Sequence, residues 1–225
     1  MITKLNVLNP ELHIKTIRGR SFKRYGRQIH QIKVPELIAV LNKQTPTPES
    51  GNIYVASFAP LEETEAAHLI RSHIFGSMPI QVGYCNGLGV KMNAMEYHKC
   101  PEVLAAGTDL VLILGKTSDI NNLRYDSDQV EIFFVPANSM IELYQDTLHY
   151  APCRVSSQAF KAVIVLAQGT NTPLEEGLIP LTQEDRLLFQ KNKWLIAHSD
   201  SPSAIEQHAF TGIEGTNWMI KPSES

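Results

Sequence analysis

Side chains suited to metal binding gather in the segment Glu96-Tyr97-His98-Lys99-Cys100-Pro101-Glu102 and again at His149. On an extended strand, residues two apart point to the same face, so Glu96 and His98 would lie side by side. Glu102 follows one bend later and can turn back toward them. Two carboxylates and two imidazoles suit Fe²⁺, Mn²⁺, Zn²⁺, Co²⁺ or Ni²⁺ better than Ca²⁺ or a soft metal. The residue types and spacing therefore predict a site for one divalent transition metal, with four unrelated polar residues as the alternative.

Short apolar runs surround these residues and indicate the elements that would position them. The runs are rich in Val, Ile and aromatic residues and end at turn residues, which is typical of strands. They lie at 52–58, 80–83, 110–115, 130–136, 141–144 and 161–167. No long helical period interrupts residues 80–169. The pattern predicts an all-β sandwich or barrel, and a small jelly-roll barrel can hold a ligand site in its interior.

The predicted ligands resemble the motifs of the cupin superfamily. In that family a first motif reads His-x-His, then three or four residues, then Glu, and a second motif ends in His. Here Glu96 replaces the first His, whereas His98, the three-residue gap and Glu102 match the pattern, and His149 falls at the second-motif His. Gly89 stands close to the leading glycine of the first motif. The resemblance covers about half of the chain and implies a cupin-type jelly-roll β-barrel with a four-ligand metal site.

The chain departs from the cupin pattern elsewhere. Tyr144-Gln145-Asp146 replaces the Pro-x-Gly of the second motif, Cys153 replaces its trailing Asn, and no glycine follows Glu102 at the usual place. The segment Ser21–Ile29 is similar to the Phe-x-x-Phe/Tyr-Gly-x-x-Ile opening of the ureidoglycolate lyase group of cupins. The whole chain also resembles a bacterial cupin family described only as a domain of unknown function. Among the characterised cupins, the chain resembles the metal-dependent sugar isomerases and lyases most.

The 225 residues are enough for one large β domain with additions. We expect a single domain over 1–225, with a barrel core at about 52–170, an N-terminal extension at 1–51 and a C-terminal extension at 171–225. Short helices are expected in the additions, and residues 199–225 are expected to be partly mobile because they are polar and Ser-rich. The predicted helices lie at 35–42, 62–75 and 183–190, and a loop is predicted at 44–51.

Composition and charge exclude several classes of partner. The net charge of −3 gives no general attraction to nucleic acid or to an anionic membrane. The apolar runs are far shorter than the roughly 20 residues that a membrane span requires. Three cysteines without a CxxC spacing, and an N-terminus without a signal-peptide core, indicate a cytoplasmic protein with no disulfide. Cys100 lies between two predicted ligands, but a small packing thiol is the simpler interpretation.

Chemistry at such a metal also needs a proton shuttle within hydrogen-bond reach. Lys161 is the first candidate, because it shares the parity of Val163 and Val165 and would then point inward. The alternative is a solvated lysine at the strand end. Glu131 is a similar candidate on the face of Phe133 and Val135. Tyr97 and Tyr150 adjoin predicted ligands but alternate to the opposite face, and are therefore weaker candidates.

Two classes of function remain open. The first is a metal-dependent isomerase or lyase that acts on a small sugar, sugar acid or hydroxy acid through a metal-stabilised enediolate or oxyanion. The second is a non-catalytic cupin that binds a small molecule as a sensor or store. A homodimer is a further expectation. Five basic residues at 18–27, interleaved with two aromatic residues, suit an anion site, although a solvated strand edge is the simpler interpretation.

Overall fold

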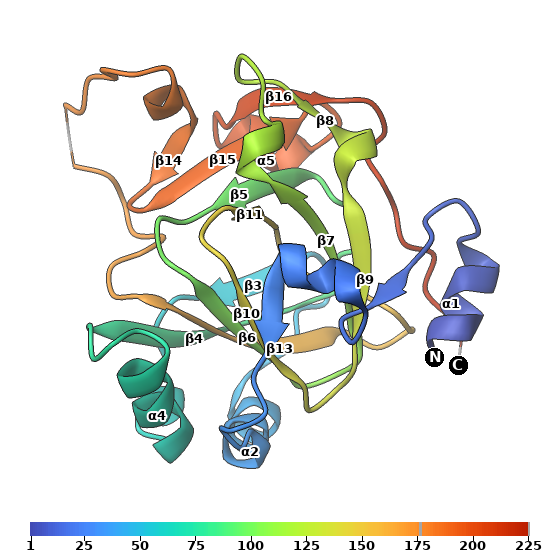
Figure 1. Cartoon of the computed structure of the whole chain (residues 1–225), viewed down its shortest axis with the longest axis vertical. Coiled ribbons are helices and arrows are strands. Elements are labelled where there is room, and N and C mark those ends of the chain that lie inside the picture. The colour runs from blue at the N-terminus through green and yellow to red at the C-terminus, as the bar shows by residue number, and fades with distance from the viewer. Residues whose placement is uncertain (176, 225) are drawn as a thin grey trace.

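The computed structural model describes residues 1–175 and 177–224, and it consists mainly of strands in several sheets (Figure 1). This arrangement confirms the prediction of a mostly β chain. Helices α2 and α4 lie on one side of the strands, and the last strands of the chain lie on the opposite side (Figure 1). The helices are α1 (Ile2–Leu8), α2 (Pro35–Gln44), α3 (Ala59–Glu62), α4 (Glu65–His73) and α5 (Pro202–Glu206).

The largest sheet has six strands, and every neighbouring pair is antiparallel. Its strands alternate side chains between an inner face and a face that is covered by helices α2, α3 and α4. The inner face carries Leu104 and Ile164, whereas Val103, Val163 and Val165 pack against the helices. Along the sheet the order is β2 (Gly26–Gln28), β10 (Met140–Leu143), β6 (Glu102–Ala106), β13 (Phe160–Ala167), β4 (Ile80–Gly87) and β3 (Asn52–Val55).

A second sheet faces the inner side of the first. Its order is β1 (Lys15–Thr16), β9 (Glu131–Val135), β7 (Leu110–Lys116) and β11 (Thr147–Leu148), with β12 (Cys153–Arg154) also paired to β7. Strand β5 (Ala94–Tyr97) joins it through a backbone bridge between Glu96 and His149. Leu112 and Phe133 of this sheet pack against the inner face of the first, which builds the core between the two layers.

The strand order explains how the chain brings distant motifs together. Strands β4, β6, β10 and β13 lie in one sheet and β7, β9 and β11 in the other, to which β5 is joined by the Glu96–His149 bridge. Among these strands, successive ones lie in opposite layers except for β7 and β9, which are neighbours in the second sheet. Each of the six apolar runs identified in the sequence overlaps one of these strands or β3, and β4 continues beyond its run to Gly87. The predicted strand positions are confirmed.

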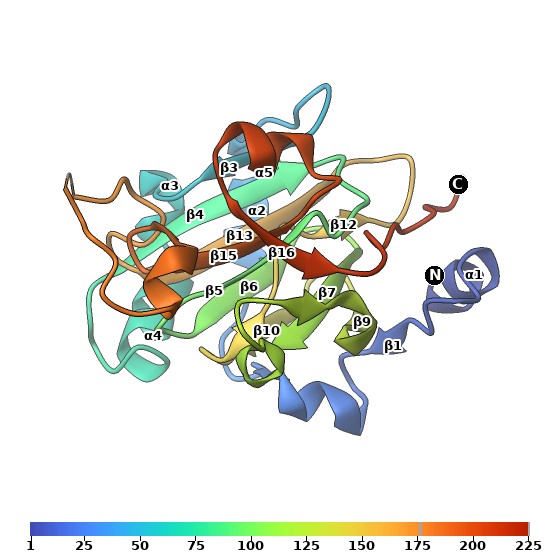
Figure 2. The ribbon, with the colours of Figure 1, turned by 90° about the horizontal axis from the view of Figure 1, so that it is seen from above.

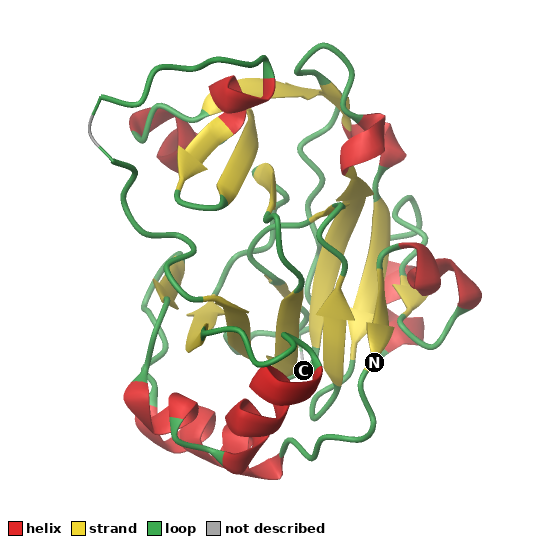
Figure 3. Cartoon of the chain, turned by 60° about the vertical axis from the view of Figure 1, so that its left-hand side comes forward, coloured by secondary structure: helices red, strands yellow, loops and turns green. Residues whose placement is uncertain are grey.

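The C-terminal residues form a third sheet, which the sequence analysis did not predict. Its order is β14 (Leu188–Gln190), β15 (Lys193–His198), β16 (Phe210–Glu214) and β8 (Tyr125–Asp126). Strand β15 also pairs antiparallel with β5, the strand that carries Glu96. Figures 1 and 3 show this smaller sheet at the end of the molecule opposite the helices α2 and α4, and Figure 2 shows β15 beside β5. The sequence analysis expected short helices in this extension, whereas the observed elements after residue 170 are mainly strands, with α5 and one 3₁₀ turn.

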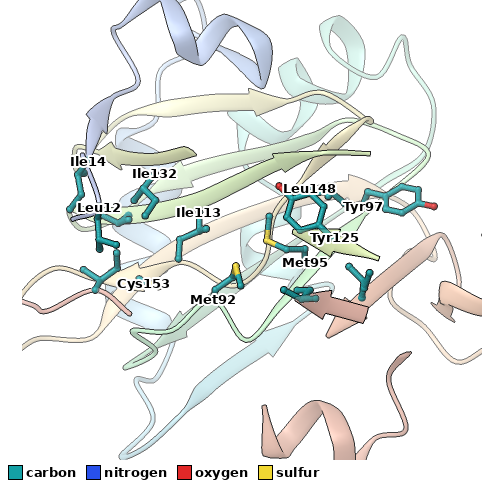
Figure 4. Packing of buried hydrophobic residues seen from close by; sticks show 14 of the residues in the cluster. Leu12, Ile14, Met92, Met95, Tyr97, Ile113, Tyr125, Ile132, Leu148 and Cys153 are labelled. Atoms are coloured by element: carbon teal, nitrogen blue, oxygen red, sulfur yellow. The ribbon is translucent and has the colours of Figure 1, made fainter. Parts of the chain in front are cut away.

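The polar tail also contains ordered elements. It contributes α5 and β16 and buries Ile213 and Ile220 in the cluster shown in part in Figure 4. In the same figure Met95, Tyr125 and Leu148 lie close together, so this core is shared by β5, β8 and β11. The apolar side chains of the tail explain why it packs against the barrel in spite of its serine content.

The helices agree with the sequence predictions in part. The predicted helix at 35–42 is observed as α2, and the predicted loop at 44–51 follows it with one residue of overlap. The predicted helix at 62–75 is divided into α3 and α4, because Thr64 caps α4 by accepting a hydrogen bond from Ala67 N. The predicted helix at 183–190 is a single 3₁₀ turn, Glu184–Leu187, followed by β14. Among the described residues, none of the helices is long and apolar enough to cross a membrane.

The three cysteines are free, as predicted. Cys85 and Cys153 are buried, and Cys100 is partly buried. Burial raises the pKa of both Cys85 and Cys153 to about 12, so these thiols behave as small packing side chains.

Candidate metal centre

The fold brings all four predicted metal ligands to one place between the sheets. Glu96 lies on β5, His98 follows its last residue, Glu102 begins β6 and His149 follows β11. The backbones of Glu96 and His149 exchange two hydrogen bonds, of 2.6 Å from Glu96 N and 3.0 Å from His149 N. Residues 99 and 100 form the bend that turns Glu102 back toward His98. All four side chains are buried.

The ligand atoms are spaced as a shared ion requires. Glu96, His98 and His149 each offer one atom within 4.8 Å of the other two. Glu102 is outside this set of three, but its Oε2 lies 3.1 Å from His149 Nε2 and 3.7 Å from His98 Nε2. Two ligand atoms at about 2.1 Å from one ion are roughly 3.0–3.4 Å apart in tetrahedral or adjacent octahedral positions. The distance of 3.1 Å lies within this range and the distance of 3.7 Å lies slightly above it, so small side-chain movements would close the site.

Backbone carbonyls orient both imidazoles. His98 Nδ1 donates to Asn192 O at 2.8 Å, and His149 Nδ1 donates to Thr147 O at 2.9 Å. Because a carbonyl can only accept, each Nδ1 carries the proton and each Nε2 of a neutral ring keeps its lone pair. His98 Nε2 is buried and has no hydrogen-bond partner among the described residues. A buried lone pair without a partner is unusual, and it fits a metal ligand.

The electrostatics of the site differ between the two histidines. Burial lowers the pKa of His98, which keeps its ring neutral as a metal ligand requires. Burial also acts to lower the pKa of His149, but the Glu102 and Glu96 carboxylates and the Thr147 carbonyl together outweigh burial and raise it to about 9. The pKa of Glu96 is lowered in spite of burial, mainly by Lys193 and then by His98. Without a metal, therefore, a proton on His149 balances part of the negative charge.

Lys193 is a site residue that the sequence analysis missed. It begins β15, and its ammonium forms an ion pair with Glu96 Oε2. Leu195 lies directly opposite Glu96 in the β5–β15 pair, and Lys193 shares the face of Leu195. The feature that could have indicated Lys193 is its position as a charged residue at the start of the mainly apolar run 193–198. The sequence analysis does not single it out, because it places the end of the barrel core near residue 170.

Asn192 directly precedes β15 and holds the bend at residues 99 and 100, between the ligands His98 and Glu102. Besides the carbonyl that binds His98, its side chain accepts from Lys99 N at 2.9 Å and donates to Thr170 Oγ1 at 2.9 Å and Cys100 Sγ at 3.3 Å. Its φ of 54° lies in the left-handed region, which asparagine tolerates better than most residues. Asn192 is therefore the residue through which the C-terminal sheet positions His98.

Replacing Asn192 separates the contributions of its side chain and its backbone. Asn192→Gly should lower the free energy of unfolding by about 1–2 kcal/mol, because the hydrogen bonds at the bend are lost. Asn192→Ala should cost about 1 kcal/mol more, because alanine is strained at this φ, and should weaken metal binding further by turning the carbonyl away from His98. Urea unfolding and metal titration of both variants measure the difference. Equal values for glycine and alanine would contradict the role of the backbone.

The two predicted proton shuttles lie elsewhere. Lys161 Nζ donates to Leu41 O at 3.3 Å and Thr45 O at 2.8 Å, at the C-terminal end of α2. The parity with Val163 and Val165 is as expected, but that face is covered by helices and is not the interior. Glu131 pairs with Lys15 and accepts from the Tyr25 hydroxyl at 3.2 Å. The structure therefore does not bring either residue to the metal-ligand cluster.

Lys161 is placed to stabilise α2. A cation at a helix C-terminus interacts with the last carbonyls, so Lys161→Met should lower the free energy of unfolding by about 1 kcal/mol and leave metal content unchanged. Lys43→Met is the matched control, because Lys43 is exposed in the last turn of the same helix and should change stability by less than about 0.5 kcal/mol. Loss of metal from Lys161→Met would reinstate Lys161 as a site residue.

A cavity of about 860 Å³ lies outside this cluster. Tyr97, Glu184 and Arg186 line it, and none of the four predicted ligands does. Tyr97 points away from Glu96 along β5, stacks on Trp194 with ring centroids 5.5 Å apart, and donates to Glu184 at 2.7 Å. The predicted orientation of Tyr97, opposite to the ligands, agrees with these contacts.

Comparison with solved structures finds distant matches. The crystal structure of Fe(II)-HppE with an alternative substrate has 13% identity and a TM-score of 0.30, over 38% of this chain and 41% of that one. A structure of an oxalate decarboxylase has 11% identity and a TM-score of 0.34, and the structure of oxalate decarboxylase from Bacillus subtilis at pH 4.6 has 11% and 0.33. Each of these covers 56% of this chain and 28% of the other. The chain thus spans less than half of each matched chain.

The comparison with protein families is more extensive. No curated protein matches the chain. Residues 14–218, which include all four predicted ligands together with Asn192 and Lys193, match one family model. The chain therefore belongs to the family described as Domain of unknown function (DUF4867).

Proposed function

We propose that this protein is a metal-dependent enzyme of the cupin type, an isomerase or lyase that acts on a small sugar, sugar acid or hydroxy acid. Glu96, His98, Glu102 and His149 would hold one divalent transition metal. The observation that carries the proposal is the pair of imidazoles whose Nδ1 atoms are fixed by carbonyls, while their Nε2 atoms converge with two carboxylates. Mixed carboxylate and imidazole ligands favour Mn²⁺, Fe²⁺, Co²⁺, Ni²⁺ or Zn²⁺.

A metal at this position would act as a Lewis acid toward neighbouring substrate oxygens. The chain supplies the rest of the environment. The two sheets and β15 exclude water, which strengthens each electrostatic interaction at the site. Asn192 O and Thr147 O fix the two rings, and Lys193 brings a positive charge beside Glu96. A proton shuttle among Lys161 and Glu131 is not supported by their contacts.

The second candidate function is non-catalytic binding of a small molecule or of a structural metal. The observation that favours it is burial, since Glu96, with 8% of its surface exposed, is the most exposed of the four side chains. A metal enclosed by four protein ligands with no open position is typical of a structural site. The two functions differ in whether the bound metal can take an external ligand.

Elemental analysis of the purified protein, followed by turnover assays, tests the proposal. We expect about one equivalent of a transition metal per chain and turnover of a sugar acid or hydroxy acid that is lost on chelation and restored by the metal. Metal at full occupancy without turnover or ligand exchange would favour the structural alternative. Absence of bound metal after incubation with each of the five ions would overturn both the enzyme and the structural-metal alternative.

A further inference from the structure

Lys193 connects the C-terminal sheet with the candidate metal centre. Its side chain is only 13% exposed, although it carries an ammonium group. The ammonium forms an ion pair with Glu96 and lies 5.8 Å from the ring centre of Tyr150 and 5.9 Å from that of Phe189. Aromatic faces attract a cation without neutralising it. Glu96 is therefore its principal anionic partner.

Glu96 serves two roles that compete. It is one of the three residues that meet within 4.8 Å as metal ligands, and it is also the partner of Lys193. When a carboxylate coordinates an ion, much of its negative charge is directed to that ion. Lys193 is then left in a buried position with a weakened partner, which is unfavourable unless another anion takes its place.

The charges of the cluster indicate what that anion would be. Glu96 and Glu102 are negative, Lys193 is positive, and ligand histidines are neutral. A divalent ion therefore leaves a single net positive charge in a buried site. A monoanion would neutralise it, whereas a neutral sugar would not. The charge count favours a substrate with one carboxylate.

The other lysines near the site form ion pairs with glutamates at the surface. Lys99 pairs with Glu184 at 2.8 Å and lies over the ring of Trp194 at 4.3 Å, and Lys191 pairs with Glu175 at 3.6 Å. Among the ion pairs of residues 1–175 and 177–224, Lys193 is the lysine that contacts a member of the metal-ligand cluster. The cation for an anionic substrate group is thus Lys193.

We propose that Lys193 binds the carboxylate of the substrate beside the metal, and that the substrate class is a small hydroxy monocarboxylate, such as a 2-hydroxy acid or a sugar acid, in place of a neutral sugar. This inference rests on the proposed function and narrows its substrate class. The substrate carboxylate exchanges with Glu96 as the partner of Lys193, and its hydroxyl is directed to the metal. Lys193 is then a residue that determines specificity.

Binding measurements on the metal-loaded protein test this proposal. Two matched pairs of probes differ in the carboxylate alone: glycolate against ethylene glycol, and D-gluconate against D-sorbitol. Isothermal titration should detect an acid and give at least tenfold weaker binding for its alcohol. Lys193→Met should weaken binding of the acid by about tenfold or more, because a charge-assisted hydrogen bond is lost, and Lys193→Arg should retain most of it. Lys191→Met is the matched control and should bind as the wild type does.

Metal content separates this inference from the proposed function. Lys193→Met should bind the metal alone at least as tightly as wild type, because a positive charge next to a ligand is removed. If the wild type bound no metal, the proposed function would fail and this inference with it. If metal content were normal but acids and alcohols bound equally, or Lys193→Met bound acids as well as wild type, the inference alone would fail. A melting curve checks that Lys193→Met is folded.

Discussion

Replacing His98 or His149 by alanine should lower the affinity for a divalent metal by roughly two orders of magnitude or more. Each variant removes an Nε2 that converges on Glu102, at 3.7 Å and 3.1 Å respectively. Loss of a partner that only orients a ligand already costs about 10–100-fold in affinity, so loss of the ligand itself should cost at least as much. Elemental analysis and competition with a chelator measure this effect, and turnover should be lost in parallel.

The fold should survive both substitutions. Its core rests on apolar side chains from the two sheets, such as Leu112, Phe133 and Ile164, and not on the metal. Far-UV circular dichroism should therefore be unchanged. His68→Ala is the matched control, because His68 is exposed on α4 and should keep full metal content. If His149→Ala kept full metal, the ligand assignment would be wrong.

The variant Glu96→His introduces the residue that stands at this position in the cupin motif that the segment resembles. It should keep the metal, with a preference shifted toward ions that favour imidazole. It also removes the anionic partner of Lys193, so it should be less stable than wild type without metal.

Metal affinity should rise with pH by up to about tenfold per unit and level off near pH 9. Without metal, burial acts to lower the pKa of His149, but the Glu102 carboxylate 3.1 Å away, together with the Glu96 carboxylate and the Thr147 carbonyl, raises it to about 9. A metal ligand must be the neutral ring, so below this pH the ion has to displace a proton. Titrations in chelator-buffered metal between pH 6.5 and 9 measure the slope.

The stability of the metal-free protein should change in the opposite direction. A raised pKa means that the folded state holds the proton more tightly than the unfolded chain, in which a histidine titrates near 6.5. The stabilisation, on the order of 3 kcal/mol for this buried pair, is complete below pH 6.5 and is lost as pH rises through about 9. The melting temperature without metal should therefore fall over this range, while the increase on adding metal grows. A metal-induced increase that is independent of pH would contradict the pairing of His149 with Glu102.

Local sequence pattern determined the strands and the ligand motif. The apolar runs predicted β3, β4, β7, β9, β10 and β13, because short runs of branched and aromatic residues fit a pleated, buried surface. The spacing of Glu96 and His98 on one strand, and of Glu102 after a bend, also follows from local geometry. The convergence of His149 on the same point could be expected only from the resemblance to cupins, since it depends on how the strands cross between sheets.

Tertiary structure decided which face is the interior and what completes the site. Period-two alternation shows that Lys161 shares a face with Val163, but not whether that face meets the other sheet or the helices. Likewise, nothing local to β5 indicates that β15, far along the chain, pairs with it and delivers Asn192 and Lys193 to the ligands. Strand pairing over such separations is set by the packing of the whole fold, so the sequence alone determined the candidate ligands, and the third sheet decided their surroundings.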